Sequence, residues 1–344
     1  MSRQPSRGRR TSRSSRPKRY GGTRKATLEE RFANDVRAMD ERARTRFSRE
    51  PLPMGIPAGS EEPRSFSFEW ALSPVSLSAE EKVAEVVVRR GEFGWVEDER
   101  LEEIETFVEQ HAMSLEQALS LRSALLQQKT VYSHGKLKSK AGKMAAHYRA
   151  GSTIIELSKD NDFPPMNVFR AVLEANGWSK NKIKESLRAP SSMKERERKE
   201  FEAAEAADRV TNVDQTETHE RADLFEEILA DWFEAQGVRI RRQPEMVKEQ
   251  QKEHGRPIRT PDILFLDHVT INGSPVAWID AKHFYGADVD FQRKKTKKQM
   301  TRYMDEWGSG AIVYRHGFSE NLFIPGVSML DAGPLDLTKL DSPE

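Results

Sequence analysis

The chain has 344 residues, which predicts two or three domains. Hydrophobic residues make up 36% and charged residues 32%, so the composition is polar for a single globule and predicts a sizeable disordered fraction. The absence of cysteine excludes disulfides, cysteine-based zinc sites and a thiol nucleophile, and no apolar run approaches the roughly 20 residues of a membrane helix.

The N-terminal segment carries a charge that the net value of +1 hides. Residues 1–26 contain ten Lys or Arg and no acidic residue, which leaves 46 Lys and Arg against 55 Asp and Glu in the rest. We expect residues 1–64 to be a disordered basic tail with one helix at about 28–47. Such a tail is typical of nucleic-acid binding, nuclear import or organelle targeting, or of a solvated segment without a specific partner. We therefore expect an intracellular protein of the nucleus or cytoplasm, with organelle targeting as the alternative.

Residues 76–190 show the apolar spacing of amphipathic helices and predict an all-α domain, in which Ser114 is a good N-cap. Segment 148–175 predicts a short helix, a turn at 159–162 and a second helix that Pro164 and Pro165 open. This order is the outline of a helix-turn-helix unit. Asn167 and Arg170 would then lie on the outer face of the second helix and could contact DNA. The alternative is an ordinary pair of packed helices.

Residues 191–219 predict a charged linker, helical at about 194–207 and a loop at 210–219. The pattern then changes to that of an α/β domain at 220–328, followed by a C-terminal tail at 329–344. A helix with one apolar stripe is expected at 221–236, and a second long helix at 289–307. Strands are expected at 238–242, 262–266, 269–271, 276–281 and 311–314, with a hairpin turn at Asn272-Gly273. With the hairpin 269–271 and 276–281 counted as one unit, the element order is α-β-β-β-α-β, which predicts a mixed sheet flanked by helices.

Two carboxylates are expected to meet where neighbouring strands begin and end. Asp262 begins one strand, Asp280 ends its antiparallel neighbour, and alternation places Lys282 on the same face as Asp280. Two adjacent carboxylates repel each other unless a cation joins them. Mg²⁺ or Mn²⁺ suits such a site, with Asp262, Asp280 and the backbone carbonyl of Ala281 as ligands. The ion would activate water for attack on a phosphodiester, and Lys282 would orient or deprotonate that water.

An acid-x-Lys triplet alone is a weak signal, because this chain contains three. Glu80-Glu81-Lys82 and Glu197-Arg198-Lys199 lie in charged helical stretches, whereas Asp280-Ala281-Lys282 ends an apolar strand and follows the single Pro-Asp of the chain. The alternative for the third triplet is a surface ion pair at a strand end. The paired Asp262 and the element order favour the catalytic interpretation.

Two helices could complete the site. Glu226 borders the apolar stripe of helix 221–236 while Glu227 points away, so Glu226 is the expected further metal ligand, directly or through water. Gln299 and Tyr303 share a face of helix 289–307 and could hold DNA or support the metal ligands. The same helix carries a basic set that could contact phosphates or simply be solvated: Arg293, Lys294, Lys295, Lys297 and Lys298. His268 and His283 near the site are expected to be structural or surface residues.

Five motifs stand out in the α/β segment: Thr260-Pro261-Asp262, Trp278-Ile279-Asp280-Ala281-Lys282, Phe284-Tyr285-Gly286, Gln299 with Tyr303, and Tyr314-Arg315-His316-Gly317-Phe318. Together they resemble the motifs of the TPD-motif family, which includes a codanin-interacting nuclease. The resemblance covers about residues 145–325 and includes the stretch from Phe163-Pro164-Pro165 to Leu173.

The family looks like the PD-(D/E)xK nuclease superfamily. The resemblance implies a restriction-endonuclease-like fold, active-site roles for Glu226, Asp262, Asp280 and Lys282, and the Gln-x-x-x-Tyr pattern of RecB-like nucleases for Gln299 and Tyr303. It also implies a codanin-like protein partner. Asp280 stands where animal members usually have Glu, which the superfamily pattern allows.

Two functions follow as expectations. The first is a Mg²⁺- or Mn²⁺-dependent nuclease that acts on nucleic acid, DNA in particular. The second is a catalytically idle nuclease fold that serves as a DNA-binding or chromatin-assembly adaptor. The intact set of two acids and a lysine favours the first.

Overall fold

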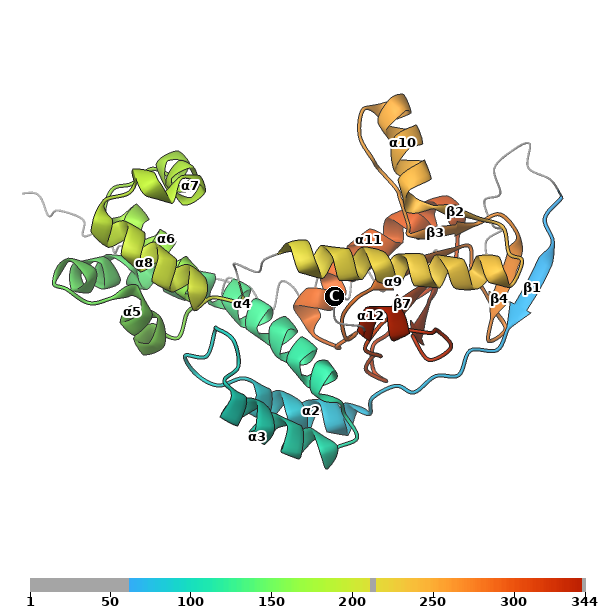
Figure 1. Cartoon of the computed structure of the whole chain (residues 1–344), viewed down its shortest axis with the longest axis horizontal. Helices are drawn as coiled ribbons and strands as arrows, with labels where there is room; N and C mark the ends of the chain where they lie inside the picture. Colours follow the sequence, from blue (N-terminus) through green and yellow to red (C-terminus); the bar gives the residue numbers. More distant parts are fainter. Residues whose placement is uncertain (1–61, 211–214, 342–344) are drawn as a thin grey trace, which may run out of the picture.

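The computed structural model of this protein describes residues 62–210 and 215–341, which form a helical part and an α/β part (Figure 1). The expected basic tail, with the helix predicted at 28–47, lies outside these residues except for its last three positions. In Figure 1, helices α5 to α8 lie at one end of the molecule and strand β1 (Ser65–Phe68) at the other. Across the described ranges, no helix combines the length and the apolar character needed to span a membrane.

The first helical cluster attaches to the α/β part. It contains α2 (Leu77–Val87), α3 (Asp98–Glu109) and the N-terminal half of α4 (Leu115–Arg149). Ser114 caps α4 as predicted, in a capping box with Gln117. The apolar cores of these helices continue into Tyr285 and Val289 of the α/β part. Buried Glu80 accepts a hydrogen bond of 2.6 Å from the Tyr285 hydroxyl, so α2 is fixed to the α/β part by packing and by hydrogen bonding.

The second helical cluster surrounds the C-terminal half of α4. It contains α5 (Ile154–Asn161), α6 (Pro165–Ala175), α7 (Lys180–Arg188), the 3-10 turn η1 (Pro190–Ser192) and α8 (Glu195–Ala206). The predicted turn at 159–162 is wrong for its first part, because α5 continues to Asn161 and ends at Asp162 in the left-handed conformation. The stretch expected as a linker contains α8, whose Phe201 and Ala204 are buried in this cluster. They lie three residues apart on one face, which is enough to pack a helix that is otherwise charged.

The α/β part is built on a mixed sheet of five strands in the order β2-β3-β6-β7-β8. These are β2 (Ile240–Arg242), β3 (Ile263–Phe265), β6 (Trp278–Lys282), β7 (Gly310–Tyr314) and β8 (Val327–Asp331). The pairs β2–β3 and β3–β6 are antiparallel, and β6–β7 and β7–β8 are parallel. The expectation of a mixed sheet with flanking helices is therefore confirmed.

A short hairpin lies outside this sheet. Strands β4 (His268–Ile271) and β5 (Ser274–Pro275) form a second sheet with β1. Asn272 and Gly273 connect β4 and β5 with φ values of 51° and 75°, as expected for an Asn-Gly turn.

Four elements of the α/β part differ from the expectation. Helix α10 (Gln243–His254) lies between β2 and β3, and was missed because Met246 is its only buried residue and leaves no apolar stripe to detect. Strand β8 and the short helix α12 (Thr338–Asp341) extend into the segment expected to be a C-terminal tail. Helix α9 (Gln215–Ala235) begins inside the expected loop at 210–219.

Helices cover both faces of the five-stranded sheet. On one face, Phe225 and Leu229 of α9 pack against Ile263 and Ile279. On the other, Met300 of α11 (Asp290–Trp307) packs in the cluster that contains Trp278. Because successive side chains of a strand alternate, Trp278, Asp280 and Lys282 of β6 point toward the α11 face.

Candidate functional site

The site lies where β3 begins beside the end of β6. The antiparallel register pairs Ile263 with Ile279, so Asp262 and Asp280 are the next opposed residues. Their side chains are almost inaccessible, at 7% and 1% exposure for the two residues. Burial and the charges of Asp280 and Glu226 raise the pKa of Asp262 well above its usual value. The predicted convergence of these two carboxylates is confirmed.

Both oxygen atoms of Asp262 are held by hydrogen bonds. The Gln243 side chain donates from Nε2 to Oδ1 at 2.6 Å, and the Ala281 backbone N–H donates to Oδ2 at 2.7 Å. Gln243 is the first residue of α10, directly after β2. Sequence reasoning missed Gln243 because it missed α10. The signal that could have found it is Pro244, a residue typical of a helix start, shortly after strand β2.

Asp280 is held by groups from its own strand and from α11. The Lys282 ammonium forms an ion pair with Asp280 Oδ2, and Gln299 Nε2 donates to Asp280 Oδ1 at 2.9 Å. Gln299 Nε2 also lies 3.1 Å from the Tyr303 hydroxyl, which donates to the Thr260 carbonyl at 3.1 Å. The pair Gln299 and Tyr303 was predicted on one helix face, and the structure brings both residues to the site. They connect the Asp280 carboxylate to the segment that precedes Asp262.

Lys282 is the local counter-ion of the acidic residues. Burial lowers the pKa of Lys282, but the charges of Asp280 and Asp262 outweigh burial and hold it above its usual value. The ammonium group is therefore fully protonated at neutral pH. Its side chain is 16% exposed.

Glu226 reaches the site from α9. It is half-buried, whereas Glu227 is exposed, as the helical spacing predicts. Burial, together with the charges of Asp223 and Asp280, raises the pKa of Glu226 to about 7. Glu226 therefore interacts electrostatically with the other acidic residues of the site and shares their negative field.

This pKa predicts a pH dependence of stability when divalent metal is absent. The pKa of Glu226 rises from 4.5 to about 7 on folding, so the folded protein binds more protons than the unfolded chain within that window. This group alone should therefore make the free energy of unfolding fall as pH increases from about 4.5 to 7, whereas His283, whose pKa is lowered to about 4, makes it rise between about pH 4 and 6.5. Because Glu226→Gln removes only the first contribution, the free energy of unfolding should change with pH in a more positive direction in this variant than in the unchanged chain.

Urea unfolding at a series of pH values in EDTA measures this dependence. Glu227→Gln is the matched control, since it removes an exposed carboxylate from the next position of the same helix. Identical slopes in the two variants would show that Glu226 is not in the acidic field of the site.

The site offers ligands for one divalent cation but not a cage of several carboxylates. In residues 62–210 and 215–341, no three His, Cys, Asp or Glu side chains converge closely enough to enclose a metal ion. Asp280 Oδ2 is buried and, apart from the Lys282 ion pair, accepts no hydrogen bond in the described residues. Two buried carboxylates with one such oxygen fit Mg²⁺, which takes one or two carboxylates and completes its shell with waters and substrate oxygens.

Pro261 explains how a backbone carbonyl can join these ligands. Phe265 N–H donates to the Ala277 carbonyl, and the same antiparallel register continued by four residues pairs position 261 with Ala281. The 261 N–H would donate to the Ala281 carbonyl, but proline has no N–H. The Ala281 N–H is taken by Asp262 instead. The Ala281 carbonyl at this edge therefore receives no ladder hydrogen bond from position 261.

The basic set on α11 is less exposed than predicted. Arg293 forms ion pairs with Asp288 and Asp290, so its charge is neutralised locally. Lys297 is 3% exposed, and its prediction as part of a solvent-facing phosphate contact is wrong, because this turn of α11 packs inside the molecule. Lys294 is half-buried, and Lys295 and Lys298 are exposed.

The remaining predicted residues lie outside the acidic site. His283 contacts Arg315, and burial together with the charge of that arginine lowers the pKa of His283 to about 4. His268 is exposed on β4 in the other sheet. Asn167 and Arg170 lie on α6 in the second helical cluster.

Comparison with known proteins locates the family resemblance in the α/β part. Residues 193–331 match the sequence model of a family described as "Protein of unknown function TPD sequence-motif". This segment includes the acidic residues, Gln243, Lys282, Gln299 and Tyr303. The expected resemblance to the TPD-motif family is thus confirmed over these residues, whereas 145–192 lie outside the match.

A relative with lower coverage is "Uncharacterized protein L539" of Acanthamoeba polyphaga mimivirus. It is 29% identical over 119 residues, which are 33% of this chain and 42% of the relative. The chain therefore matches less than half the length of that protein. No solved structure matches the chain.

Proposed function

We propose that this protein is a metal-dependent nuclease that hydrolyses phosphodiester bonds in nucleic acid, DNA in particular, on a restriction-endonuclease-like domain of the PD-(D/E)xK type. The observation that carries the proposal is the opposed pair Asp262 and Asp280 with Lys282 on the same face. The repulsion between two adjacent buried carboxylates is offset when they bind a cation. The intact lysine beside them distinguishes this arrangement from a purely structural acid pair.

Each residue has a distinct role in this proposal. Asp262 and Asp280 hold Mg²⁺ or Mn²⁺ with the Ala281 carbonyl, and Glu226, which does not converge closely with the two aspartates, supports the ion through water. Bound there, the metal lowers the pKa of a water molecule and stabilises negative charge on the phosphate. Lys282 orients the attacking water or neutralises charge that develops on the phosphate oxygens. Gln243 and Gln299 keep the two aspartates in position through the hydrogen bonds described above.

The proposal is tested with the full chain and a panel of labelled nucleic acids. Single-stranded, duplex, flapped and branched DNA and single-stranded RNA are incubated with Mg²⁺, with Mn²⁺ or with EDTA. We expect cleavage of at least one DNA substrate that requires metal and is lost in Asp262→Asn. Cleavage that persists in Asp262→Asn would place the activity elsewhere. Binding without cleavage of any substrate would favour a DNA-binding adaptor.

Pro261 provides a prediction that does not depend on turnover. In Pro261→Ala, the new N–H can donate to the Ala281 carbonyl and compete with the metal for that oxygen. We expect the affinity for Mn²⁺ to fall by about 10-fold to 100-fold, the range seen when groups that support metal ligands are changed. Isothermal titration calorimetry measures this affinity directly.

The matched control is Pro257→Ala, which changes an exposed proline of the loop that precedes β3. Its Mn²⁺ affinity should equal that of the unchanged chain. An unaltered affinity in Pro261→Ala would mean that the Ala281 carbonyl is not a ligand.

A further inference from the structure

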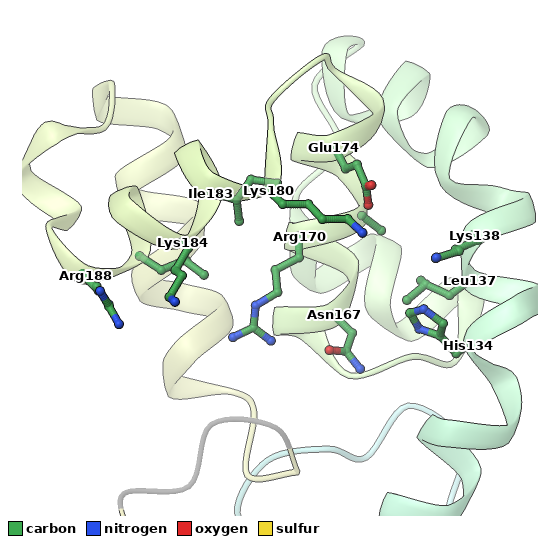
Figure 2. Close-up of a pocket in the computed structure, with 12 residues that line it drawn as sticks. His134, Leu137, Lys138, Asn167, Arg170, Glu174, Lys180, Ile183, Lys184 and Arg188 are labelled. Carbon is green, nitrogen blue, oxygen red and sulfur yellow. The ribbon is translucent and has the colours of Figure 1, made fainter.

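A second candidate site lies in the helical part, away from the acidic residues. A pocket of about 530 Å³, open to solvent, is lined by residues of α4, α6 and α7. Figure 2 shows Asn167 and Arg170 of α6 in its centre, between Lys184 and Arg188 of α7 on one side and Lys138 of α4 on the other. The volume falls in the range of about 300–1,000 Å³ that small ligands occupy. The pocket is therefore large enough for one unit of a polymer, such as a nucleotide.

The pocket is strongly basic. Five cationic side chains line it, against one carboxylate from Glu174: Lys138, Arg170, Lys180, Lys184 and Arg188. The surrounding helices extend this charge, because no acidic residue occurs between Glu116 and Glu156. That stretch includes the whole of α4 after its first turn and carries exposed Lys136, Lys140 and Lys143. Outside the N-terminal 26 residues the chain has an excess of acidic residues, so this concentration of positive charge is local.

The floor of the pocket is apolar. Leu137, Ala171, Ile183 and Leu187 contribute to its lining, and Leu137 and Ile183 also belong to the second helical core. An apolar floor with a cationic rim suits a ligand that combines a flat apolar group with negative charge. A nucleotide has both, since its base can lie on the floor or on the Arg170 guanidinium while its phosphates meet the lysines.

The shape of the pocket argues against recognition of the DNA major groove by α6. A recognition helix must project its side chains into a groove about 12 Å wide. Asn167, Arg170 and Ala171 are instead half-buried, because α4 and α7 form walls on either side of them. Asn167 and Arg170 lie on the face of α6 that is not buried in the helical core, as predicted, but this face lines a pocket and does not project from the molecule. A concave pocket of nucleotide size can receive a base that is not paired.

We propose that the pocket between α4, α6 and α7 binds an unpaired nucleotide within single-stranded nucleic acid. This inference rests on the proposed function, because it takes nucleic acid as the substrate. It predicts that the substrate of the acidic site contains a single-stranded segment. The pocket anchors that segment, while the strand ends of β3 and β6 carry the chemistry.

Binding is measured by fluorescence anisotropy with the full chain in EDTA, using labelled oligodeoxythymidine and a duplex of mixed sequence. We expect the single strand to bind more tightly than the duplex. Arg170→Glu with Lys184→Glu should weaken single-strand binding by about tenfold or more. The slope of log affinity against log salt should become less steep by about 0.7 for each lost phosphate contact. The matched control Lys143→Glu reverses an exposed charge of α4 outside the pocket lining and should have a much smaller effect.

Ala171→Trp separates the pocket from a merely basic surface. The larger side chain fills the floor and leaves every cation in place, so single-strand binding should fall by about tenfold while duplex binding is retained. Circular dichroism and thermal unfolding check that both pocket variants are folded, and Asn167→Ala gives a second, milder variant. The proposal would be overturned if Lys143→Glu lost as much single-strand affinity as the pocket variants. It would also be overturned if the protein bound duplex more tightly than single strand and Ala171→Trp left the duplex affinity unchanged. Binding is measured in EDTA, which prevents metal-dependent cleavage, so the test of the pocket does not depend on nuclease activity. If the protein cleaves nucleic acid but does not prefer single strands, the pocket proposal is refuted and the proposed nuclease function stands.

Discussion

Methionine in place of Lys282 should lower the rate of phosphodiester cleavage by about 10²–10⁴-fold, the range of effects seen when a group that moves a proton or stabilises developing charge is removed. Methionine preserves much of the side-chain length, so the effect comes from the lost ammonium group. The affinity for Mn²⁺ should be unchanged or higher, since a cation at Asp280 no longer competes with the ion pair of Lys282. Asp280→Asn should instead lose metal binding together with cleavage.

Single-turnover cleavage and calorimetric titration with Mn²⁺ separate these two effects. Lys248→Met is the matched control, because it removes an exposed lysine from α10, a helix of the same α/β part. Comparable cleavage rates in Lys282→Met and Lys248→Met would exclude Lys282 from the reaction.

Alanine in place of Gly310 should destabilise the α/β part by an amount at or above the upper end of about 1–3 kcal/mol, the usual cost of overpacking. A Cβ at this position would lie 2.2 Å from two ring atoms of Trp278. The ring cannot move aside readily, because Trp278 is fully buried and its Nε1 donates to the Gly308 carbonyl at 2.9 Å. Since Trp278 lies on β6 two residues before Asp280, the same change should also disturb the site.

Chemical denaturation with far-UV circular dichroism measures this loss. Gly142→Ala is the matched control, because Gly142 is an exposed position within α4 and an added Cβ there meets no atom within 4 Å. It should raise stability by about 0.5–1 kcal/mol through the better helix propensity of alanine. A stability loss in Gly310→Ala no larger than about 0.5 kcal/mol would show that β6 and β7 can separate locally to admit the methyl group.

The acidic site could be predicted from sequence to an unusual degree, because its main features depend on strand geometry. Asp280 and Lys282 share a face through the two-residue period of a strand. Asp262 opposes Asp280 because β3 and β6 run antiparallel, and an antiparallel pairing places the start of β3 beside the end of β6. Glu226 was distinguished from Glu227 by helical period in the same way. Each of these relations follows from the local conformation of one or two short segments.

The positions of Gln243 and Lys297 could not be predicted, because they depend on packing between segments that the apolar periodicity of the sequence does not relate to one another. Gln243 supports Asp262 only because α10 begins directly after β2, and α10 has a single buried residue to reveal it. Lys297 is buried on α11, and α11 contacts α4, a helix far from it in the chain. Periodicity reports which side of a helix is apolar, and it does not report which polar side chain another element will cover.

The sequence by itself determined the acid pair, its lysine, the Asn-Gly turn and the basic composition of residues 117–155, since these follow from residue identity and local backbone period. Only the tertiary structure decided why the Ala281 carbonyl receives no backbone hydrogen bond from position 261, and where the basic helices meet. Pro261 has this effect because of the register between β3 and β6. The charges of α4, α6 and α7 form a pocket because their apolar faces share one core, so burial of those faces determines where the cations gather.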